Sequence, residues 1–560
     1  MRRWNGWGET TTSYPLPENA GEFLSGRVGP GTPPQDAALA DVVGAVPKSR
    51  LPDHPLLKID PAARLRHARG QSLPDWVALR TGRIPAFPDG VAYPVTAVEV
   101  EELIAFSQKA GAQLIPYGGG TSVVGHINVG HINVGHTTVG HINAGHINPP
   151  GDGPPVITLN LQRLNRLLRF DRTNQLATFG AGIMGPDLEA HLRARGYTLG
   201  HFPQSFEFST LGGWVATRSS GQQSLGYGRI EDLFAGGSMV TPQGRLDMPP
   251  FPASAAGPDL RQLVLGSEGR LGIITEATVR VSPLPEREDF HAVFFPDFES
   301  GLTAVRTIVQ ARLPLSLLRL STAVETTTTL ALAGHERLIG LLEQLLYLRG
   351  ISEGKCLLML GFTGTNDQVK QTRSAALETT STYGGVHVGR QFGRQWANGR
   401  FRTPYLRNSL WEAGYAVDTL ETATTWSNVP LMLNAIETAI HNAIAPFDEK
   451  AHVFTHLSHV YRQGASIYTT YLFRLGADGE ETLARWQAMK TAASEAIVAH
   501  RGTISHQHGV GTDHAPYLAA EKGEPGMAAL HALCHQFDPE GVLNPGRLIS
   551  SLGIQWGDKP

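Results

Sequence analysis

Cysteine is nearly absent from this sequence, since only Cys356 and Cys534 occur among 560 residues. Two cysteines so far apart supply neither a disulfide framework nor a zinc ligand set, and they are typical of a protein in a reducing compartment. An excess of charge of one sign is also lacking, because 47 Lys and Arg residues face 50 Asp and Glu residues and leave a net charge of −3. Nucleic-acid-binding proteins usually carry a basic excess, so we expect no nucleic-acid partner.

Long apolar runs are missing as well. No stretch approaches the roughly 20 residues of a membrane-spanning helix, so we expect at most peripheral membrane contact. Residues 1–8 lack the apolar core of a signal peptide, and residues 557–560 are not a peroxisomal signal. We therefore expect a cytoplasmic protein. Its length exceeds what one hydrophobic core usually serves, which predicts two or three domains.

Three segments containing glycine follow one another along the chain. They are residues 116–123 (PYGGGTSV), 204–214 (QSFEFSTLGGW) and 266–274 (GSEGRLGII). Glycine lets a backbone approach a phosphate closely, and the amides of a turn point at the anion. Three such segments in this order indicate a site that wraps a long cofactor carrying a pyrophosphate. The first is not a Rossmann fingerprint, because it does not open a helix directly.

A five-residue repeat, Gly-His-Ile-Asn-Val and close variants, occupies residues 125–149. Its five histidines recur at every fifth residue. With this spacing they would not share one face of a helix or of a strand. Neither cysteine nor a carboxylate accompanies them. We interpret the repeat as a surface loop lengthened by duplication, and metal binding is the alternative.

Hydrophobic periodicity predicts helices and strands on both sides of a boundary at residues 283–285. A helix that begins after Thr96 in a capping box and ends at Gly111 leads into the first glycine segment. The expected strands are 112–116, 156–161, 175–181, a pair within 229–247, 271–281, 291–295, 357–362 and 467–473. The other expected helices are a short one within 64–76, then 186–195, 430–445 and 481–500.

The glycine segments also carry a family resemblance. Together with residues 4–8 (WNGWG), 66–70 (RHARG), 230–233 (IEDL) and 544–546 (NPG), they make nearly the whole chain resemble the alkyldihydroxyacetonephosphate synthases. These alkylglycerone-phosphate synthases are ether-lipid flavoenzymes of the vanillyl-alcohol-oxidase type. The resemblance implies an α+β fold, with a PCMH-type FAD-binding domain of two α+β subdomains and an α+β cap domain with an antiparallel sheet. The implied parts are an irregular or helical segment at 1–85, the FAD-binding domain at 86–285, the substrate-binding cap at 286–530, and a segment at 531–560 that returns to the FAD-binding domain.

The resemblance assigns FAD to the glycine segments and to the residues after the second one. Some relatives attach FAD covalently through a histidine in the first glycine turn. Thr121 takes that place here, so we expect FAD to be bound non-covalently. For any single Ser or Thr in the set, ordinary turn chemistry is the alternative. The implied cofactor-binding residues are Pro116, Tyr117, Gly118, Gly119, Gly120, Thr121, Ser122, Gln204, Ser205, Ser209, Thr210, Thr217, Arg218, Ser219, Ser220, Glu268, Gly269, Gly272, Ile273 and Ile274.

The resemblance further implies the exchange of the acyl group of acyl-dihydroxyacetone phosphate for a fatty alcohol, without net oxidation. Tyr468 matches the catalytic tyrosine and could move a proton if its pKa were lowered, whereas a cross-strand aromatic is the alternative. Arg407 and Arg319 match substrate-binding arginines, and Arg407 is the better phosphate partner. Arg319 is alternatively a charge at a sheet edge. His201 matches a catalytic histidine, with a buried structural histidine as the alternative.

Residues 505–511 (SHQHGVG) distinguish two possible reactions. The synthases carry three consecutive histidines here, whereas this chain has Gln507 between His506 and His508, which are candidates for acid–base work or flavin contact. The basic residues that follow in the synthases are replaced by residues 512–515 (TDHA). Flavin-dependent D-lactate and glycolate dehydrogenases share the His-Gly-x-Gly part. The alternative function is therefore FAD-dependent oxidation of a D-2-hydroxy acid or related alcohol, and a flavin-binding protein without catalysis is a third, disfavoured one.

Those dehydrogenases also use histidine metal ligands before the position of Tyr468. His452, His456 and His459 stand there in this chain without the accompanying Gly-Asp-Gly, so we expect no metal in the site and keep metal binding as the alternative. The expected partner is a small molecule, either lipid-like or a hydroxy acid. A homodimer is the candidate assembly.

Overall fold

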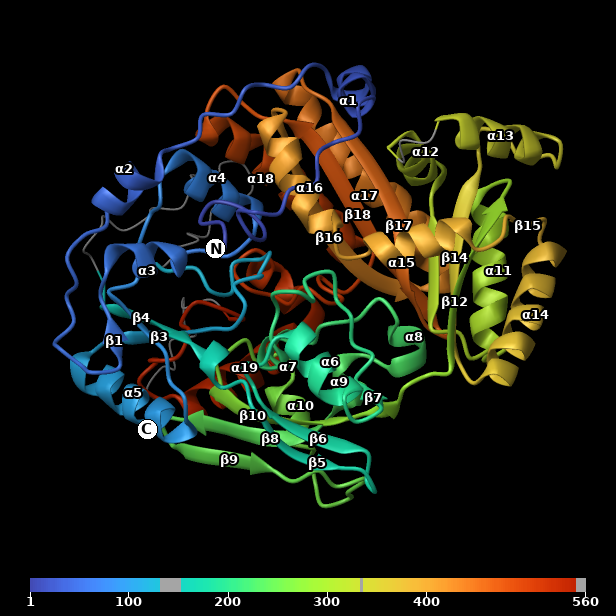
Figure 1. The fold of residues 1–560 in the computed structure, drawn as a ribbon. Coiled ribbons are helices and arrows are strands. Elements are labelled where there is room, and N and C mark those ends of the chain that lie inside the picture. The colour runs from blue at the N-terminus through green and yellow to red at the C-terminus, as the bar shows by residue number, and fades with distance from the viewer. Residues whose placement is uncertain (131–152, 333–335, 550–560) are drawn as a thin grey trace.

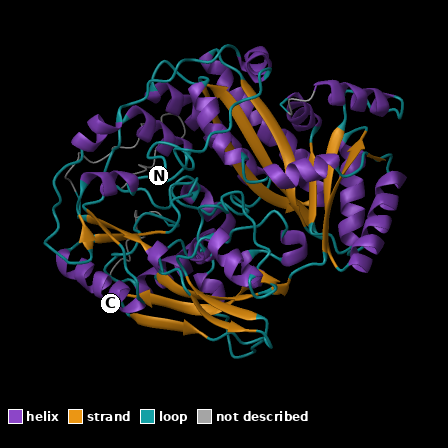
Figure 2. Cartoon of the chain, viewed as in Figure 1, coloured by secondary structure: helices purple, strands orange, loops and turns teal. Residues whose placement is uncertain are grey.

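The computed structural model describes residues 1–130, 153–332 and 336–549. Figure 1 shows a body with two larger sheets, one of β1–β4 and one of β5, β6, β8, β9 and β10, beside a second body built on one large sheet. Helices and strands are mixed throughout both bodies, as Figure 2 shows by colour. The expected α+β fold with an antiparallel sheet is therefore confirmed.

A four-stranded sheet carries the first glycine segment at the end of a strand. Its order is β1-β2-β4-β3, and β2, β4 and β3 are parallel to one another. Helix α5 (Ala97–Ala110) precedes β3, is capped by the Thr96 side chain, and ends at the left-handed Gly111, as predicted. The Glu99 carboxylate bonds the amide of Val95 rather than that of Thr96, so the capping box is only half formed. The strands are β1 (Leu57–Lys58), β2 (Gly90–Ala92), β3 (Gln113–Tyr117) and β4 (Val156–Asn160).

A five-stranded antiparallel sheet with the order β5-β6-β10-β8-β9 forms the second part of this body. The β8–β9 hairpin turns at Thr241–Gly244, within residues 229–247, where a pair of strands is expected. Residues 230–233, expected within a strand, instead form helix α9. The strands are β5 (Leu167–Asp171), β6 (Leu176–Gly180), β8 (Phe234–Thr241), β9 (Gly244–Met248) and β10 (Ile273–Arg280), and β7 (Tyr197–Thr198) pairs with β11 (Ser282–Pro283). The helices are α6 (Gly185–Arg193), α7 (Leu211–Thr217), α8 (Ser224–Tyr227), α9 (Ile230–Leu233) and α10 (Arg261–Val264).

A seven-stranded antiparallel sheet with the order β15-β12-β14-β13-β17-β18-β16 forms the centre of the second body. Apolar side chains on one face pack against α11, α14, α17 and α18 in the largest hydrophobic core, which includes Phe295, Ile436 and Trp486. Helices α12, α13 and α15 cover the other face of β12–β14 through a smaller core. The strands are β12 (Arg287–Phe295), β13 (Leu317–Ser321), β14 (Cys356–Gly364), β15 (Val386–His387), β16 (Tyr415–Thr425), β17 (Ala451–Val460) and β18 (Gly464–Arg474). The helices are α11 (Phe298–Gln310), α12 (Ala323–Ala331), α13 (Glu336–Tyr347), α14 (Asn366–Thr382), α15 (Gln391–Gly399), α16 (Thr403–Glu412), α17 (Val429–Ile444) and α18 (Gly479–Ala499).

The two ends of the chain pack against these bodies. The single helix expected within 64–76 is wrong, because two helices form there and Gly70, between them, lies against the Ser122 carbonyl with no room for a Cβ. The second begins at Ser72 in a capping box with Asp75, a sequence signal that the prediction overlooked. Near the other end, the Leu114 amide of β3 donates to the Val542 carbonyl at 2.8 Å. The terminal helices are α1 (Ala20–Val28), α2 (Leu39–Gly44), α3 (Pro61–Arg66), α4 (Leu73–Thr81) and α19 (Leu518–Phe537).

None of the helices in the described part of the chain is both long enough and apolar enough to cross a bilayer.

Candidate functional site

The first two glycine segments meet directly. A Cβ on Gly119 would overlap the Phe208 carbonyl oxygen, and one on Gly118 would overlap the Thr210 hydroxyl. Gly120 has a φ of +67°, a left-handed conformation that favours glycine. This turn at the end of β3 therefore requires its glycines for both close approach and backbone shape.

The third glycine segment closes on the other two. The amides of Gly266 and Glu268 donate to the carbonyls of Val215 and Ala216 at the end of α7, at 3.1 and 3.0 Å. Gly269 has a φ of +76°, and a Cβ there would overlap the Pro116 ring. Three segments spread over more than 150 residues of sequence (116 to 274) are thus brought together, as their order predicted.

Several hydroxyls of the expected cofactor set bond other protein groups. Ser209 accepts from the Trp214 indole at 2.7 Å, Thr210 caps α7, and Ser219 bonds His201 at 3.0 Å. By contrast, the hydroxyl of Ser220, which belongs to that set, is buried without a hydrogen-bond partner in the described structure, and so is that of Ser267, which was not expected from the sequence. Unpartnered buried hydroxyls are costly, so these two point to a polar ligand that reaches them.

The rest of the expected cofactor set differs in exposure and contacts. Tyr117 is buried, whereas Gln204 is exposed. Ile273 and Ile274 lie in the hydrophobic cores of their body. The Arg218 guanidinium donates to the Leu265 carbonyl at 3.2 Å, so it braces the third segment. The Thr217 hydroxyl donates to the Gly213 carbonyl, the Ser122 hydroxyl bonds His126, and the Ser205 carbonyl accepts the amides of Phe208 and Ser209.

A row of polar side chains crosses the seven-stranded sheet on the face opposite the main helix layer. Tyr468 of β18 is paired with Glu421 of β16 on one side and with His456 of β17 on the other. Their strand neighbours, such as Leu420 and Ile467, belong to the helix-side core, so alternation directs the polar row to the other face. The rings of His456 and Tyr468 stack with centroids 5.0 Å apart.

The two predicted arginines differ in the partners that their guanidinium groups already have. Arg407 on α16 lies with its guanidinium 4.4 Å from the centroid of Trp76 and donates from Nη1 to the Gln71 carbonyl at 2.6 Å. Its Nη2 is buried without a partner among the described residues. Arg319 instead forms an ion pair with Glu325 and bonds His456 at 3.2 Å. Arg407 is therefore the better placed to receive an anion.

The loop at 505–511 runs between the polar row and the glycine segments. The Glu421 carboxylate accepts the amides of His506, Gln507 and His508, and the Glu268 carboxylate accepts those of Val510 and Gly511. His508 lies with its ring centroid 5.7 Å from that of Tyr468. His508 therefore stands beside the predicted tyrosine, whereas the His506 ring bonds the Tyr461 hydroxyl at 2.5 Å. Neither glutamate had been assigned this task from the sequence.

Burial sets the protonation of these groups. It raises the pKa of Tyr468 to about 12, against the opposing influence of Arg407. The surroundings of Tyr468 thus do not supply a lowered pKa, and its phenol is a neutral hydrogen-bond donor. Burial also lowers the pKa of His508 and places that of His506 well below 6.5, in the latter case assisted by His459 and Arg229. Both imidazoles are neutral and able to accept a proton.

His201 is almost fully buried and bonds Ser219 through Nε2. Burial, followed by the charges of His459 and Arg229, lowers its pKa to about 3. Its Nδ1 has no partner within the described residues. His201 therefore combines the contacts of a structural histidine with one nitrogen that remains available.

The first copy of the repeat lies in the core, which corrects the expectation of a surface loop for that copy. His126 and Asn128 are only 6% and 5% exposed. The His126 ring bonds Ser122 at 2.8 Å and lies 3.2 Å from the Glu268 carboxylate. The repeat copies within 131–149 lie outside the described residues.

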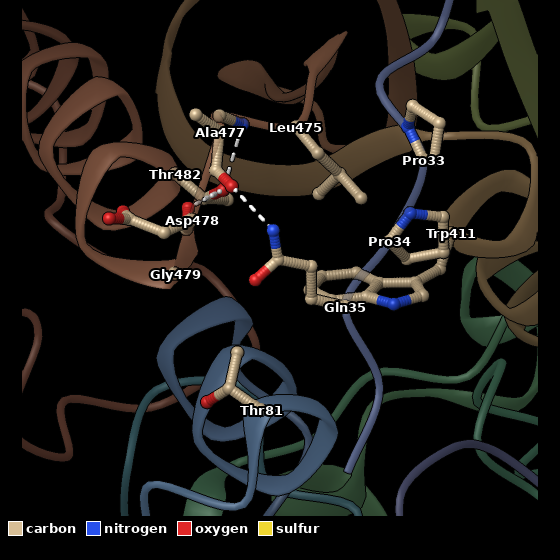
Figure 3. A pocket seen from close by; sticks show the side chains of 11 residues that line it. Pro33, Pro34, Gln35, Thr81, Trp411, Leu475, Ala477, Asp478, Gly479 and Thr482 are labelled. Atoms are coloured by element: carbon tan, nitrogen blue, oxygen red, sulfur yellow. Dashed lines mark hydrogen bonds between the residues drawn. The ribbon is translucent and has the colours of Figure 1, made fainter.

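Two surface hollows contain none of these residues. One lies between residues 33–35, Trp411 and 475–482, where the Gln35 amide donates to the Ala477 carbonyl at 3.1 Å (Figure 3). The other is lined by strands β5, β6 and β10 and by residues 250–252. The convergence of the glycine segments and the polar row is therefore the candidate site.

The sequence and the fold of the chain are similar to those of known proteins. The description "FAD binding domain" matches residues 136–247, and "FAD linked oxidases, C-terminal domain" matches residues 284–548. The alkyldihydroxyacetonephosphate synthase of Dictyostelium discoideum is 28% identical over 100% of this chain and 95% of its own length. That of Caenorhabditis elegans is 30% identical over 88% of this chain and 81% of its own. The chain belongs to the alkyldihydroxyacetonephosphate synthase family. A solved synthase structure superimposes with a TM-score of 0.79 at 27% identity, covering 97% of this chain and 98% of the other.

Membership of the synthase family confirms the resemblance and makes the protein an FAD-dependent enzyme. The site fits FAD by its own chemistry. The amides of Gly118–Gly120 and the unpartnered hydroxyls of Ser220 and Ser267 supply hydrogen-bond donors where the three glycine segments meet. When bound, FAD supplies the reactive isoalloxazine ring of the family's chemistry.

The histidines of β17 bond three different parts of this synthase-family chain. His452 bonds Thr328 at 2.8 Å, His456 bonds Glu325 at 2.9 Å, and His459 bonds Ser224 at 2.9 Å. Within residues 1–130, 153–332 and 336–549, no group of three or more metal-ligating side chains is gathered. The partners of these histidines explain their burial without a shared ligand.

Proposed function

We propose that this protein exchanges the acyl group of an acyl-dihydroxyacetone phosphate for a fatty alcohol, as the name of its relatives implies. The observation that carries the proposal is the match to synthases over the full chain, in sequence and in structure. Tyr468, His508 and Arg407 support it, because the Tyr468 and His508 rings are in contact, the Arg407 charge acts to lower the pKa of Tyr468, and one guanidinium nitrogen has no partner among the described residues. We further propose a cytoplasmic location and non-covalent FAD binding, the latter because Thr121 replaces the histidine that attaches the flavin in some relatives.

In this reaction, separate residues of the chain would bind the substrate and move the proton. Arg407 binds the anionic head group through its free Nη2, and its packing on Trp76 fixes the fork. Exchange of an ester acyl group for an alkoxy group releases one proton, because the alcohol loses its proton while the acid leaves as a carboxylate. Neutral His508 is suited to accept that proton, and neutral Tyr468 is suited to donate a hydrogen bond to the oxygen that leaves.

Oxidation of a D-2-hydroxy acid is the second candidate. It is favoured by the match to the FAD-linked oxidase domain and by Gln507, which departs from the three histidines of the synthases. An arginine fork suits a carboxylate as well as a phosphate, so Arg407 does not separate the two.

Anaerobic mixing of the flavin-loaded enzyme with each substrate separates the reactions. We expect acyl-dihydroxyacetone phosphate and a fatty alcohol to give ether product and free fatty acid, with the flavin oxidised at the end. Lasting bleaching of the flavin by D-lactate or glycolate, without exchange on the first substrate pair, would refute the proposal.

A further inference from the structure

We propose that Glu421 is a positioning residue, whose carboxylate holds the 505–508 backbone and thereby sets where His506 and His508 stand relative to Tyr468. The inference rests on the proposed function only for its kinetic consequence. Its structural content concerns one carboxylate and one loop.

The contacts of Glu421 are unusually many for one side chain. Its two oxygens accept the amides of His506 at 2.6 Å, Gln507 at 3.0 and 3.1 Å, and His508 at 2.8 Å. The Ser505 hydroxyl adds a fourth donor at 2.8 Å. Three consecutive amides directed at one carboxylate require one particular loop conformation. The loop shape is therefore coupled to the position of Glu421.

Burial makes this arrangement energetically demanding. Glu421 is 1% exposed, and a buried carboxylate needs compensation for its lost hydration. The ion-pair partners recorded for it are His506 Nδ1 at 3.8 Å and His508 Nδ1 at 3.6 Å. Because burial favours the neutral form of both histidines, the loop amides provide most of the compensation. Removing the carboxylate would leave three amides without their acceptor.

The strand pairing connects this anchor to the tyrosine. Glu421 and Tyr468 are opposite each other on β16 and β18, so the distance between the anchor and the phenol is fixed by the sheet. Because Glu421 holds the loop and is paired with Tyr468, the same strand pair fixes the position of His508 next to Tyr468. A histidine loop held only by its flanks would lack this link.

The other end of the loop has its own attachments. Glu268 accepts the amide of Gly511 at 2.8 Å. Within residues 505–508, the His506 carbonyl also accepts from the Arg229 guanidinium at 2.7 Å, whereas the three amides are held by Glu421. Replacing Glu421 should therefore loosen residues 505–508 locally while the rest of the loop stays attached.

Hydrogen exchange on the flavin-loaded enzyme tests the inference without reference to any reaction. In Glu421→Gln, one acceptor oxygen is replaced by an NH₂ group, so we expect the amides of residues 506–508 to exchange at least about tenfold faster. Glu421→Asp should give an intermediate rate, and it decides the question if Glu421→Gln does not fold. The matched control is Glu437→Gln, because the Glu437 carboxylate accepts from Thr455 at 2.6 Å on the other face of the same sheet. The control should leave the 506–508 amides unchanged.

Kinetics then distinguish positioning from a general structural role. We expect Glu421→Gln to lower kcat at least about tenfold while KM stays within about threefold, and Glu421→Asp to recover part of kcat. Unchanged exchange at 506–508 in Glu421→Gln, or exchange that rises equally in the control, would overturn the inference even if the synthase reaction is demonstrated. Faster exchange confined to 506–508 would support it even if the enzyme proves to be a dehydrogenase.

Discussion

Replacement of Arg407 by lysine tests the anion site most directly. The variant keeps the positive charge but loses the planar fork that donates to Gln71 from one nitrogen and leaves Nη2 available. A hydrogen bond between charged groups contributes about 1.5–3 kcal/mol, which corresponds to roughly 10- to 150-fold in affinity. We therefore expect KM for the phosphorylated substrate to rise by at least about tenfold.

The assay measures initial rates of ether formation against substrate concentration, with flavin content checked by absorbance. Arg402→Lys is the matched control, since Arg402 lies at the start of the same helix, is exposed, and packs on Tyr14 with its guanidinium 5.1 Å from the ring centroid. The control should keep KM within about twofold, because exposed charges contribute little. If Arg407→Lys matches the control, Arg407 is a structural charge, and Arg319 becomes the next candidate for the anion.

Three other outcomes are expected. Tyr468→Phe should lower kcat by at least about a hundredfold while the flavin spectrum is kept, because only a buried hydroxyl is lost; activity within about threefold of wild type would place Tyr468 outside the chemistry. Acid precipitation should release all the yellow colour into the supernatant, and flavin retained in the pellet would show a covalent link. Replacing residues 125–129 by glycine and serine should lower Tm by several degrees, because Ile127 and Val129 leave the core, as roughly 2 kcal/mol or more of lost burial implies. An unchanged Tm would contradict the burial of Ile127 and Val129.

Much of the site could be predicted because short sequence motifs contain its residues. The glycine turns identify themselves by composition, and the structure confirms that the segments at 118–120, 208–210 and 266–269 meet. Likewise Tyr468 and His508 were expected in one site and lie there together.

The parts that escaped prediction depend on contacts across the fold. Glu421 stands in an ordinary alternating strand, and only its pairing with Tyr468 and the return of the loop 85 residues later give it a purpose. The alternation of Leu420 and Glu421 was the available signal, since a charge on a strand facing away from an apolar layer needs a partner. The raised pKa of Tyr468 could not be predicted for a similar reason, because burial is a property of the assembled protein. The surface-loop expectation failed for residues 125–129 because the sequence of a repeat copy does not reveal whether that copy is buried.

The hydrogen bonds that Asn544 and Arg547 make to the cofactor region form late in the folding of the protein. Asn544 donates to the carbonyls of His126 and Glu268, at 3.1 and 2.7 Å, across 418 and 276 residues of sequence. Arg547 likewise donates to the carbonyl of Asn128. Contacts of such long range form late, since the chain loses much entropy before they reward it. The segments that Asn544 and Arg547 hold therefore stay incompletely braced until those two residues have left the ribosome, and this interval is when the nascent enzyme most needs protection from aggregation.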